Sequence, residues 1–506
     1  MYRVKELNVV RKKGKPGTVK IALAYPSIYE VAISSLAYQM IYFYVNSLEE
    51  FVAERFNLVT LSGEEPEPYS LETRTSLRKF EMIIFPVHYE PDYVNIARLL
   101  LAAGIDPRRE TRKSPIVIVG GLPLMGNPEP LTGIADVIIL GELEPTLPKL
   151  LNLYLENKER IGSFFDSLRP EEGFYVTHNL PEDVTVVHAA DLKLEFHPIA
   201  QLQSLNKYSV WERATMIEVS RGCPYRCTFC LEGSVMGPKR DRPLSQVVKI
   251  ALDGTKLNMS RKVILYSLSF FDHTNSDRIL TRFINEELEF SVPSIRLETL
   301  NEERLELISM GGQKTLTVAP ETASSELSFK LGKPLLREKL VEVAECAKKL
   351  GIKSLKLYFM VGLPWEKESD LRTIPKLVKE ISNISGFKGE RELKVNLTPF
   401  IPKPQTPLER VSMESVTSLR KKIKYIKSAL GGLADVKYYD PRWAYIQAFL
   451  SRGDSTLSNF IIKWAMYGGG LGGFRKTIKE EKPQKDFAKS LNGELPWDKV
   501  RRHVVV

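Results

Sequence analysis

The chain has 506 residues, of which 43% are hydrophobic and 26% charged, with four cysteines and a formal net charge of +10. This length exceeds what one hydrophobic core usually organises, so two or three domains are expected. The composition excludes a disordered chain, and the few cysteines exclude a disulfide framework. No apolar run approaches the roughly 20 residues of a membrane span, and no signal peptide is evident, so a cytoplasmic location is expected.

The positive charge is spread along the chain rather than concentrated. A basic balance would suit a nucleic acid, an anionic lipid surface or a phosphorylated substrate. A solvated surface rich in lysine and glutamate explains the same balance equally well, so charge alone selects no partner.

Short apolar runs alternate with helical stretches through residues 1–155. The predicted strands are VKIALAY, FNLVTL, MIIFPV, IVIVGG and DVIILGE, and segments 30–48 and 91–103 are predicted helices. Near-continuous apolar strands separated by helices indicate a parallel sheet covered on both faces. We therefore expect a flavodoxin- or Rossmann-like doubly wound α/β domain.

Residues 156–210 break this alternation with prolines and are predicted to form a connector with some strand content. The connector contains His178, His188 and His197, whose spacings of ten and nine do not share one helix face. Packed or surface histidines are expected there rather than a metal site.

A second series of strands and helices covers residues 211–425. Its predicted strands are TMIEVS, KVILYSL, VPSIRLE, KTLTVA, SLKLYFMVG and LKVNLTPF. This series predicts a partial (β/α)6 barrel of the TIM type, whose active site lies at the carboxyl ends of the strands. Residues 426–506, with a glycine-rich turn GGGLGG and a basic tail RRHVVV, are predicted to be a small C-terminal extension.

Three cysteines follow the first strand of this second series with C-x3-C-x2-C spacing: Cys223, Cys227 and Cys230. Iron–sulfur clusters usually take four cysteines, so three on one loop leave one iron of a [4Fe-4S] cube open for a cofactor. Zinc would find only three of its four ligands, and thiols without metal are the remaining alternative. Cys346 stands alone in a helical run and is predicted to pack in the core.

The cysteine spacing, with Phe229 just before the third cysteine, resembles the radical S-adenosylmethionine superfamily. The phrases AYPSIYEVAISSL, APETASSEL, PFIPKPQTPLE and LPWD resemble a branch with a cobalamin-binding-like N-terminal domain. The resemblance implies an enzyme in which S-adenosylmethionine chelates the open iron. Its reductive cleavage yields a 5′-deoxyadenosyl radical that takes hydrogen from a substrate the sequence does not name. An electron donor of the flavodoxin or ferredoxin type is implied as partner.

Two strand ends supply candidate contacts to the methionyl and ribose groups of that cofactor. In LYSLS, Tyr266, Ser267 and Ser269 would meet the methionyl amino group, although the family's usual Gly-Gly-Glu is absent. In TVAPETAS, Glu321 would accept hydrogen bonds from the ribose or the amino group. The alternative for Glu321 is an acid that begins the following helix.

A third strand end, FMVGLPWE, resembles the adenine-binding segment of the family. Gly362 would let the backbone approach the purine, with Val361 and Leu363 packing on its faces.

The strand ends of the first domain are candidates for a cobalamin site, because such sheets bind ligands beyond the strand carboxyl ends. The candidate residues are His88, Gly120, Gly121, Gly141 and Glu142. The D-x-H-x-x-G motif that supplies histidine to cobalt in one cobalamin class is absent, so cobalamin binding and a degenerate domain both stay open.

The favoured hypothesis is hydrogen abstraction from an unactivated carbon, followed by methyl transfer if cobalamin is bound. Carbon–carbon bond formation or rearrangement without cobalamin is a second hypothesis. A third is an RNA-modifying radical enzyme without cobalamin whose Arg501 and Arg502 hold RNA, although no RNA-binding module is recognisable. A non-catalytic, metal-stabilised scaffold would require all the strand-end matches to be accidental.

Overall fold

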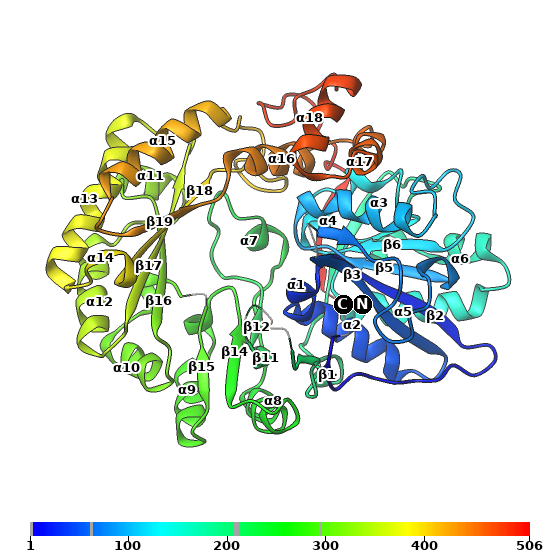
Figure 1. Cartoon of the computed structure of the whole chain (residues 1–506), viewed down its shortest axis with the longest axis horizontal. Coiled ribbons are helices and arrows are strands. Elements are labelled where there is room, and N and C mark those ends of the chain that lie inside the picture. The colour runs from blue at the N-terminus through cyan, green and yellow to red at the C-terminus, as the bar shows by residue number, and fades with distance from the viewer. Residues whose placement is uncertain (1–3, 61–63, 207–209, 211, 294, 506) are drawn as a thin grey trace. The chain divides into compact units, whose positions relative to one another are not determined.

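The computed structural model describes residues 4–60, 64–206, 210, 212–293 and 295–505 (Figure 1). The chain divides into two compact units. Unit 1 comprises Met1–Arg213, Phe449–Phe487 and Asn492–Val506, and unit 2 comprises Ala214–Ala448 and Ala488–Leu491. Within the described ranges, no helix combines the length and apolar composition needed to cross a membrane.

Unit 1 is built on a seven-stranded sheet of order β4-β3-β2-β5-β6-β7-β8. Its parallel strands are β2 (Val19–Ile28), β3 (Phe51–Thr60), β5 (Met82–Pro86), β6 (Ile116–Gly120) and β7 (Val137–Ile139). The edges β4 (Glu64–Pro66) and β8 (Phe174–Val176) run antiparallel. When the five parallel strands are numbered along the chain, they lie in the order 2-1-3-4-5. This is the flavodoxin-like order, which confirms the predicted doubly wound fold.

In unit 1, helices follow the strands along the chain and cover the sheet (Figure 1). They are α1 (Tyr29–Ile33), α2 (Leu36–Ser47), α3 (Tyr93–Ala102), α4 (Leu122–Gly126), α5 (Leu143–Asn157) and α6 (Ile161–Ser167). The helical stretch predicted over 30–48 is confirmed but divided in two, because α1 ends at Ile33 and Ser35 caps α2 by accepting a hydrogen bond from the Tyr38 amide at 3.3 Å. A short ladder joins β1 (Glu6–Leu7) to β10 (Gln203–Ser204).

Segments from the C-terminal region complete unit 1. Helix α16 (Pro441–Ser451) leads into it, followed by α17 (Leu457–Met466) and α18 (Gly470–Glu481), so the glycine-rich GGGLGG begins a helix. The Asn127 amide donates to the Ser451 and Gly453 carbonyls at 3.1 and 2.8 Å. The basic tail is not free, because β20 (Val500–Val505) pairs in parallel with β9 (Val184–His188) of the predicted connector.

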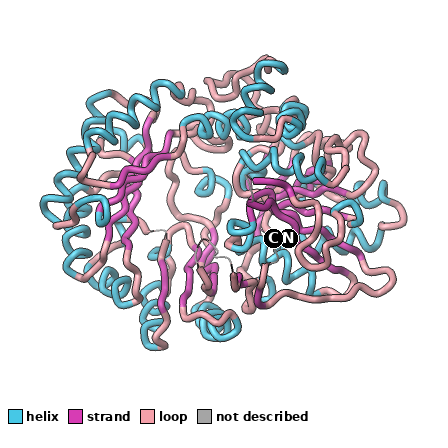
Figure 2. Tube along the Cα trace, viewed as in Figure 1, coloured by secondary structure: helices cyan, strands magenta, loops and turns pink. Residues whose placement is uncertain are grey.

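Unit 2 contains two parallel sheets whose strands line the inner side of an arc of helices (Figure 2). One sheet has the order β11 (Thr215–Glu218), β14 (Lys262–Tyr266), β15 (Glu289–Ser291). The other has the order β16 (Thr315–Glu321), β17 (Ser354–Val361), β18 (Leu393–Pro399), β19 (Asp435–Tyr438). The longer helices are α8 (Leu244–Leu257), α9 (Ser276–Asn285), α10 (Glu302–Met310), α12 (Arg337–Lys349), α13 (Glu368–Ser385) and α15 (Val416–Ala429).

Shorter elements complete unit 2. They are the antiparallel pair β12 (Ser220–Arg221) and β13 (Arg240–Asp241), with helices α7 (Leu231–Val235), α11 (Ser325–Lys330) and α14 (Gly389–Glu392).

Two strands of unit 2 differ from the prediction. The strand predicted over VPSIRLE was wrong, since β15 ends at Ser291 and Leu297–Thr299 form a 3₁₀ turn. Pro293 has no amide hydrogen to continue a ladder, which explains the early end. Strand β19 lies inside the predicted C-terminal extension, and its sequence DVKY carries no apolar run that would announce a strand.

Candidate functional site

The cysteine loop, residues 222–230, is held in a tight path by its backbone. Gly222 has φ of +80°, and a Cβ there would lie 2.6 Å from the carbonyl oxygens of Met236 and Pro238. Cys230 caps α7, since its Sγ accepts a hydrogen bond from the Gly233 amide at 3.3 Å. The loop therefore presents its cysteines from a fixed backbone directly after β12.

The three thiols lie within electrostatic reach of one another. Burial, together with the negative charges of Glu232, Cys227 and Cys223, raises the pKa of Cys230 to about 12, against the opposing hydrogen bond from the Gly233 amide. Burial likewise raises the pKa of Cys223, with Cys227 adding to the shift. In the part of the chain that the structure describes, no three His, Cys, Asp or Glu side chains converge on one ion. A cube takes each cysteine on a different iron, so that convergence is not required.

Arg296 contacts this loop from another segment. Its Nη1 donates to Cys227 Sγ at 3.5 Å, and its guanidinium carbon lies 3.6 Å from the ring centroid of Tyr225. Its Nε is buried and has no hydrogen-bond partner among the described residues. Sequence reasoning missed Arg296, because nothing local in a presumed strand indicates contact with a loop about 70 residues earlier.

The serines of LYSLS are connected to the cysteine loop. Ser267 Oγ lies 2.7 Å from the Oγ of Ser220, the first residue of β12. Ser269 Oγ donates to Asp272, whose Oδ1 accepts from the Tyr225 hydroxyl at 3.1 Å. Asp272 was not predicted, although a carboxylate shortly after a strand end is a usable signal. Tyr266, which was predicted to contact the methionyl amino group, directs its hydroxyl to Met216 Sδ at 3.5 Å.

Phe229 and Leu363 belong to one apolar cluster. Phe229 packs against a buried core made of Leu327, Leu331, Met360, Leu363, Phe400 and Leu408. Val361 is fully buried and pairs with Pro399 of β18. The aromatic neighbour of the third cysteine thus packs at the end of β17.

Gly362 is required by its backbone conformation and by the side chains packed beside it. Its φ is +77°, and a Cβ there would lie 2.5 Å from Leu419 and 3.0 Å from Glu414. Its amide donates to Glu366 Oε2 at 3.0 Å. On the side where a Cβ would lie, the space is filled by the protein's own side chains, and the approach of this backbone to a purine stays a prediction.

Glu321 ends β16 in a left-handed conformation, with φ of +66°. Its carboxylate forms an ion pair with Lys333 at 2.8 Å, and each side chain is 15% exposed. The next helix, α11, begins later with Ser324 as its cap, so Glu321 does not begin a helix. Lys333 follows a turn that contacts the cysteine loop, where the Leu331 carbonyl accepts from the Thr228 amide at 3.0 Å.

In unit 1, His88 lies at the switch point between β2 and β5, where such sheets bind ligands. It is exposed, its Nε2 lies 3.2 Å from Ser35 Oγ, and its ring stacks on Tyr25 with centroids 5.9 Å apart.

The strand-end glycines of unit 1 serve its own packing. Gly121 has φ of +134°, and a Cβ there would lie 1.9 Å from the Val87 carbonyl oxygen. A Cβ at Gly141 would lie 2.4 Å from the Val187 side chain. Gly120 would make an ordinary contact with Ile139 at 3.4 Å. The first two glycines therefore allow close packing with neighbouring segments, and their predicted contact with a corrin stays a prediction.

Glu142 and the connector histidines are likewise engaged within the protein. Glu142 is buried and its Oε1 lies 3.1 Å from His188 Nδ1. His178 Nε2 lies 3.0 Å from Asp136 Oδ1, and His197 is buried with its Nδ1 3.2 Å from a backbone carbonyl. The three histidines pack separately, in agreement with their spacing.

Arg501 and Arg502, at the C-terminal end of the chain, are the basic residues predicted to hold RNA. Arg501 forms an ion pair with Asp183 beside the β20–β9 ladder. The side chain of Arg502 lies outside the described residues.

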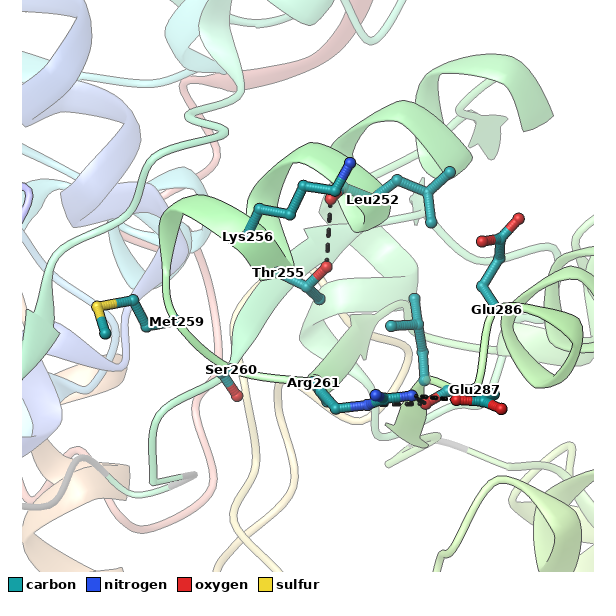
Figure 3. Close-up of a pocket in the computed structure, with 9 residues that line it drawn as sticks. Leu252, Thr255, Lys256, Met259, Ser260, Arg261, Glu286 and Glu287 are labelled. Atoms are coloured by element: carbon teal, nitrogen blue, oxygen red, sulfur yellow. Dashed lines mark hydrogen bonds and ion pairs between the residues drawn. The ribbon is translucent and has the colours of Figure 1, made fainter.

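A shallow hollow of about 480 Å³ lies at the amino ends of β14 and β15 (Figure 3). Its Arg261 and Glu287 form an ion pair at 3.0 Å, and the Thr255 hydroxyl bonds to its own helix. The cysteine loop follows strand carboxyl ends, so this hollow is not part of the candidate site.

Known proteins resemble this chain over most of its length. It is 29% identical over 443 residues to an uncharacterised protein of Methanocaldococcus jannaschii, covering 87% of this chain and 90% of that protein. It is 25% identical over 256 residues to an uncharacterised methyltransferase of Pyrococcus horikoshii, spanning only 53% of that relative. The structure of TsrM, a radical S-adenosylmethionine methyltransferase from Kitasatospora setae, shares the fold with a TM-score of 0.54 at 14% identity, covering 92% of this chain and 100% of that one.

Two family models match in chain order. The model of the N-terminal region of radical S-adenosylmethionine proteins matches residues 37–177, within unit 1. The model of the superfamily matches residues 217–378, which include the cysteine loop and the ends of β14, β16 and β17. The chain is therefore an enzyme that belongs to the radical S-adenosylmethionine superfamily.

Proposed function

We propose that this enzyme holds a [4Fe-4S] cluster on Cys223, Cys227 and Cys230 and uses it to cleave S-adenosylmethionine reductively. One observation carries the proposal. Three partly buried thiols share one rigid loop, and donors from Gly233 and Arg296 already point at two of the sulfurs. Hydrogen bonds to sulfur are a usual feature of protein-bound iron–sulfur clusters.

When bound, S-adenosylmethionine would supply the 5′-deoxyadenosyl radical that removes hydrogen from the substrate. The chain's own residues would orient it. Ser267 and Ser269 offer hydroxyl oxygens beside the loop, Phe229 and Leu363 offer an apolar surface that excludes water, and Glu321 offers a carboxylate whose position Lys333 fixes.

We further propose that unit 1 binds cobalamin and that the reaction is a methyl transfer. The fit to unit 1 rests on His88, an exposed ring at the switch point of the sheet. None of the other four candidates offers an exposed side chain for the cofactor. Gly121, Gly141 and Glu142 pack against the protein itself, and Gly120 has no side chain. Support comes from the shared fold with TsrM, whose structure contains cobalamin and a [4Fe-4S] cluster. A cytoplasmic location and an electron donor of the flavodoxin or ferredoxin type complete the proposal.

Replacing each loop cysteine by serine tests the cluster assignment. Anaerobic reconstitution of the wild type is expected to give about four irons per chain and dithionite-dependent 5′-deoxyadenosine. C223S, C227S and C230S are expected to lose both, whereas C346S, on α12, keeps both. A wild-type chain that bound zinc and made no deoxyadenosine would falsify the proposal.

Retention of hydroxocobalamin after desalting tests the second part. The wild type is expected to keep the corrin absorbance, with H88A releasing it more readily than the matched variant H178A, whose histidine contacts Asp136. If the wild type retains no corrin, methyl transfer from cobalamin is excluded while the cluster assignment stands.

A further inference from the structure

Arg296 is a cation buried against the cysteine loop. Its side chain is 10% exposed, and it touches the loop twice, at Cys227 Sγ through Nη1 and at the face of the Tyr225 ring. A guanidinium over an aromatic face at this distance is attracted by the ring quadrupole. The two contacts fix where its charge lies relative to the cysteine sulfurs.

A second set of contacts holds Arg296 from its own segment. Its Nη2 donates to Glu298 Oε1 at 2.6 Å, and the Thr299 hydroxyl bonds to the Arg296 carbonyl at 2.7 Å. Lys339 Nζ donates to the Glu298 carbonyl at 3.1 Å. Glu298 is 30% exposed, so water screens its charge more than that of Arg296.

A one-electron reduction adds one negative charge to a cluster and its thiolates. A buried positive charge and an N–H···S bond favour the more negative state, because the interaction is weakly screened away from water. The Nε of Arg296 is buried and has no hydrogen-bond partner in the described ranges, so it is a further N–H donor beside the Nη1 that bonds to Cys227.

We propose that Arg296 is a positioning residue that raises the reduction potential of the cluster, acting through Cys227. The inference rests on the proposed cluster. The electron comes from an external one-electron donor, no covalent bond changes, and Arg296 keeps its protons throughout. Without this cation, the same donor would leave a smaller fraction of the cluster reduced.

Arg304 supplies a matched control in the same unit. Its guanidinium carbon lies 4.8 Å from the Phe271 ring centroid, and it forms an ion pair with Asp277 at 3.0 Å. It thus has the same kinds of partner as Arg296, aromatic and acidic, but among the described residues it makes no hydrogen bond to sulfur.

The test is an anaerobic redox titration of the reconstituted holoenzyme without S-adenosylmethionine, followed by the electron paramagnetic resonance signal of the reduced cluster. R296Q is expected to disfavour reduction about tenfold, a fall of about 59 mV in midpoint potential for a one-electron couple. R296K is expected to recover part of the fall, and R304Q to match the wild type. E298Q removes the counter-charge of Arg296 and is expected to shift the potential upward.

The opposite directions separate an electrostatic role from a structural one. An R296Q chain with a full complement of iron and an unchanged potential overturns the inference. If R296Q does not retain a cluster, the inference is tested with E298Q alone. An unchanged or lower midpoint potential in E298Q then overturns it. A wild-type chain without a cluster sinks the proposed function itself, before any variant is compared.

Discussion

Gly121 is required by the backbone of Val87, the residue that follows β5. Its φ of +134° strains any residue with a Cβ, and that atom would overlap the Val87 carbonyl at 1.9 Å. We expect G121A to lower the free energy of unfolding of unit 1 by more than about 3 kcal/mol, measured by urea denaturation. G162A, in α6 with nothing within 4 Å of its Cβ, should be neutral or stabilising by up to about 1 kcal/mol. Equal stability of the two variants would contradict the packing role of Gly121.

Asp136 links stability to pH. Burial would raise its pKa, but hydrogen bonding with His178 and the charge of Arg112 hold the pKa below its ordinary value. A lowered folded-state pKa contributes stability above the unfolded pKa of about 3.9, and this stability is lost as the pH falls through the folded value. D136N is expected to flatten the acid limb of the stability profile below about pH 4.

The same substitution leaves a buried cation without its partner. Arg112 donates to Asp136 Oδ2 at 2.8 Å and its side chain is 1% exposed. D136N should therefore cost about 3–5 kcal/mol at pH 7. D183N, which breaks the exposed pair with Arg501, should cost at most about 1 kcal/mol. An acid limb unchanged in D136N would refute the assignment.

The cysteine residues could be predicted from sequence because their spacing is local and chemically specific. Arg296 and Lys333 could not, since nothing in the local sequence indicates their partners Cys227 and Glu321, whereas Asp272 offered a usable signal, a carboxylate shortly after a strand end, that was not used. Gly362 was singled out correctly as special, yet its cause is a side chain of α15, which no nearby sequence reveals.

At the level of elements, long apolar runs were predicted well. Strands β2, β5, β6, β16, β17 and β18 coincide closely with predicted runs. Strands β2, β5 and β6 are buried almost throughout and have near-continuous apolar sequence, whereas β16 and β18 alternate buried and half-buried residues. Short elements were missed where tertiary pairing decides them. Strand β19 is half-exposed, and β20 carries two arginines and a histidine, which led us to predict a basic tail within a C-terminal extension.

Strand β20 is expected to stabilise unit 1 through its ladder with β9. Val500 is buried and pairs with Val184. A chain ending at Lys499 should melt at a Tm lower by roughly 5 °C or more, as measured by circular dichroism. R501A, which keeps the ladder and removes only an exposed ion pair, should change Tm little. An unchanged Tm in the shortened chain would show that the ladder contributes nothing.

For the whole molecule, unit 1 is discontinuous along the chain. Helix α17 packs on α3, and Ser458 Oγ bonds to the Pro130 carbonyl at 3.0 Å and to the Gly133 amide at 2.9 Å. We expect fragment 1–213 to unfold at lower urea concentration than the same residues in the full chain. Co-expression with fragment 449–506 should recover the loss. Full stability of fragment 1–213 alone would contradict a structural role for the later segments.

This discontinuity also governs synthesis. The ribosome must deliver Ala214–Ala448 between the two parts of unit 1, which takes roughly 10–50 s at ordinary elongation rates. During that interval the nascent face of α3 lacks its partner helix, while nearly all of unit 2 is contiguous and can fold as it emerges. The order of assembly is thus set by the chain's topology: the catalytic half matures first, and the N-terminal half waits for helices made last.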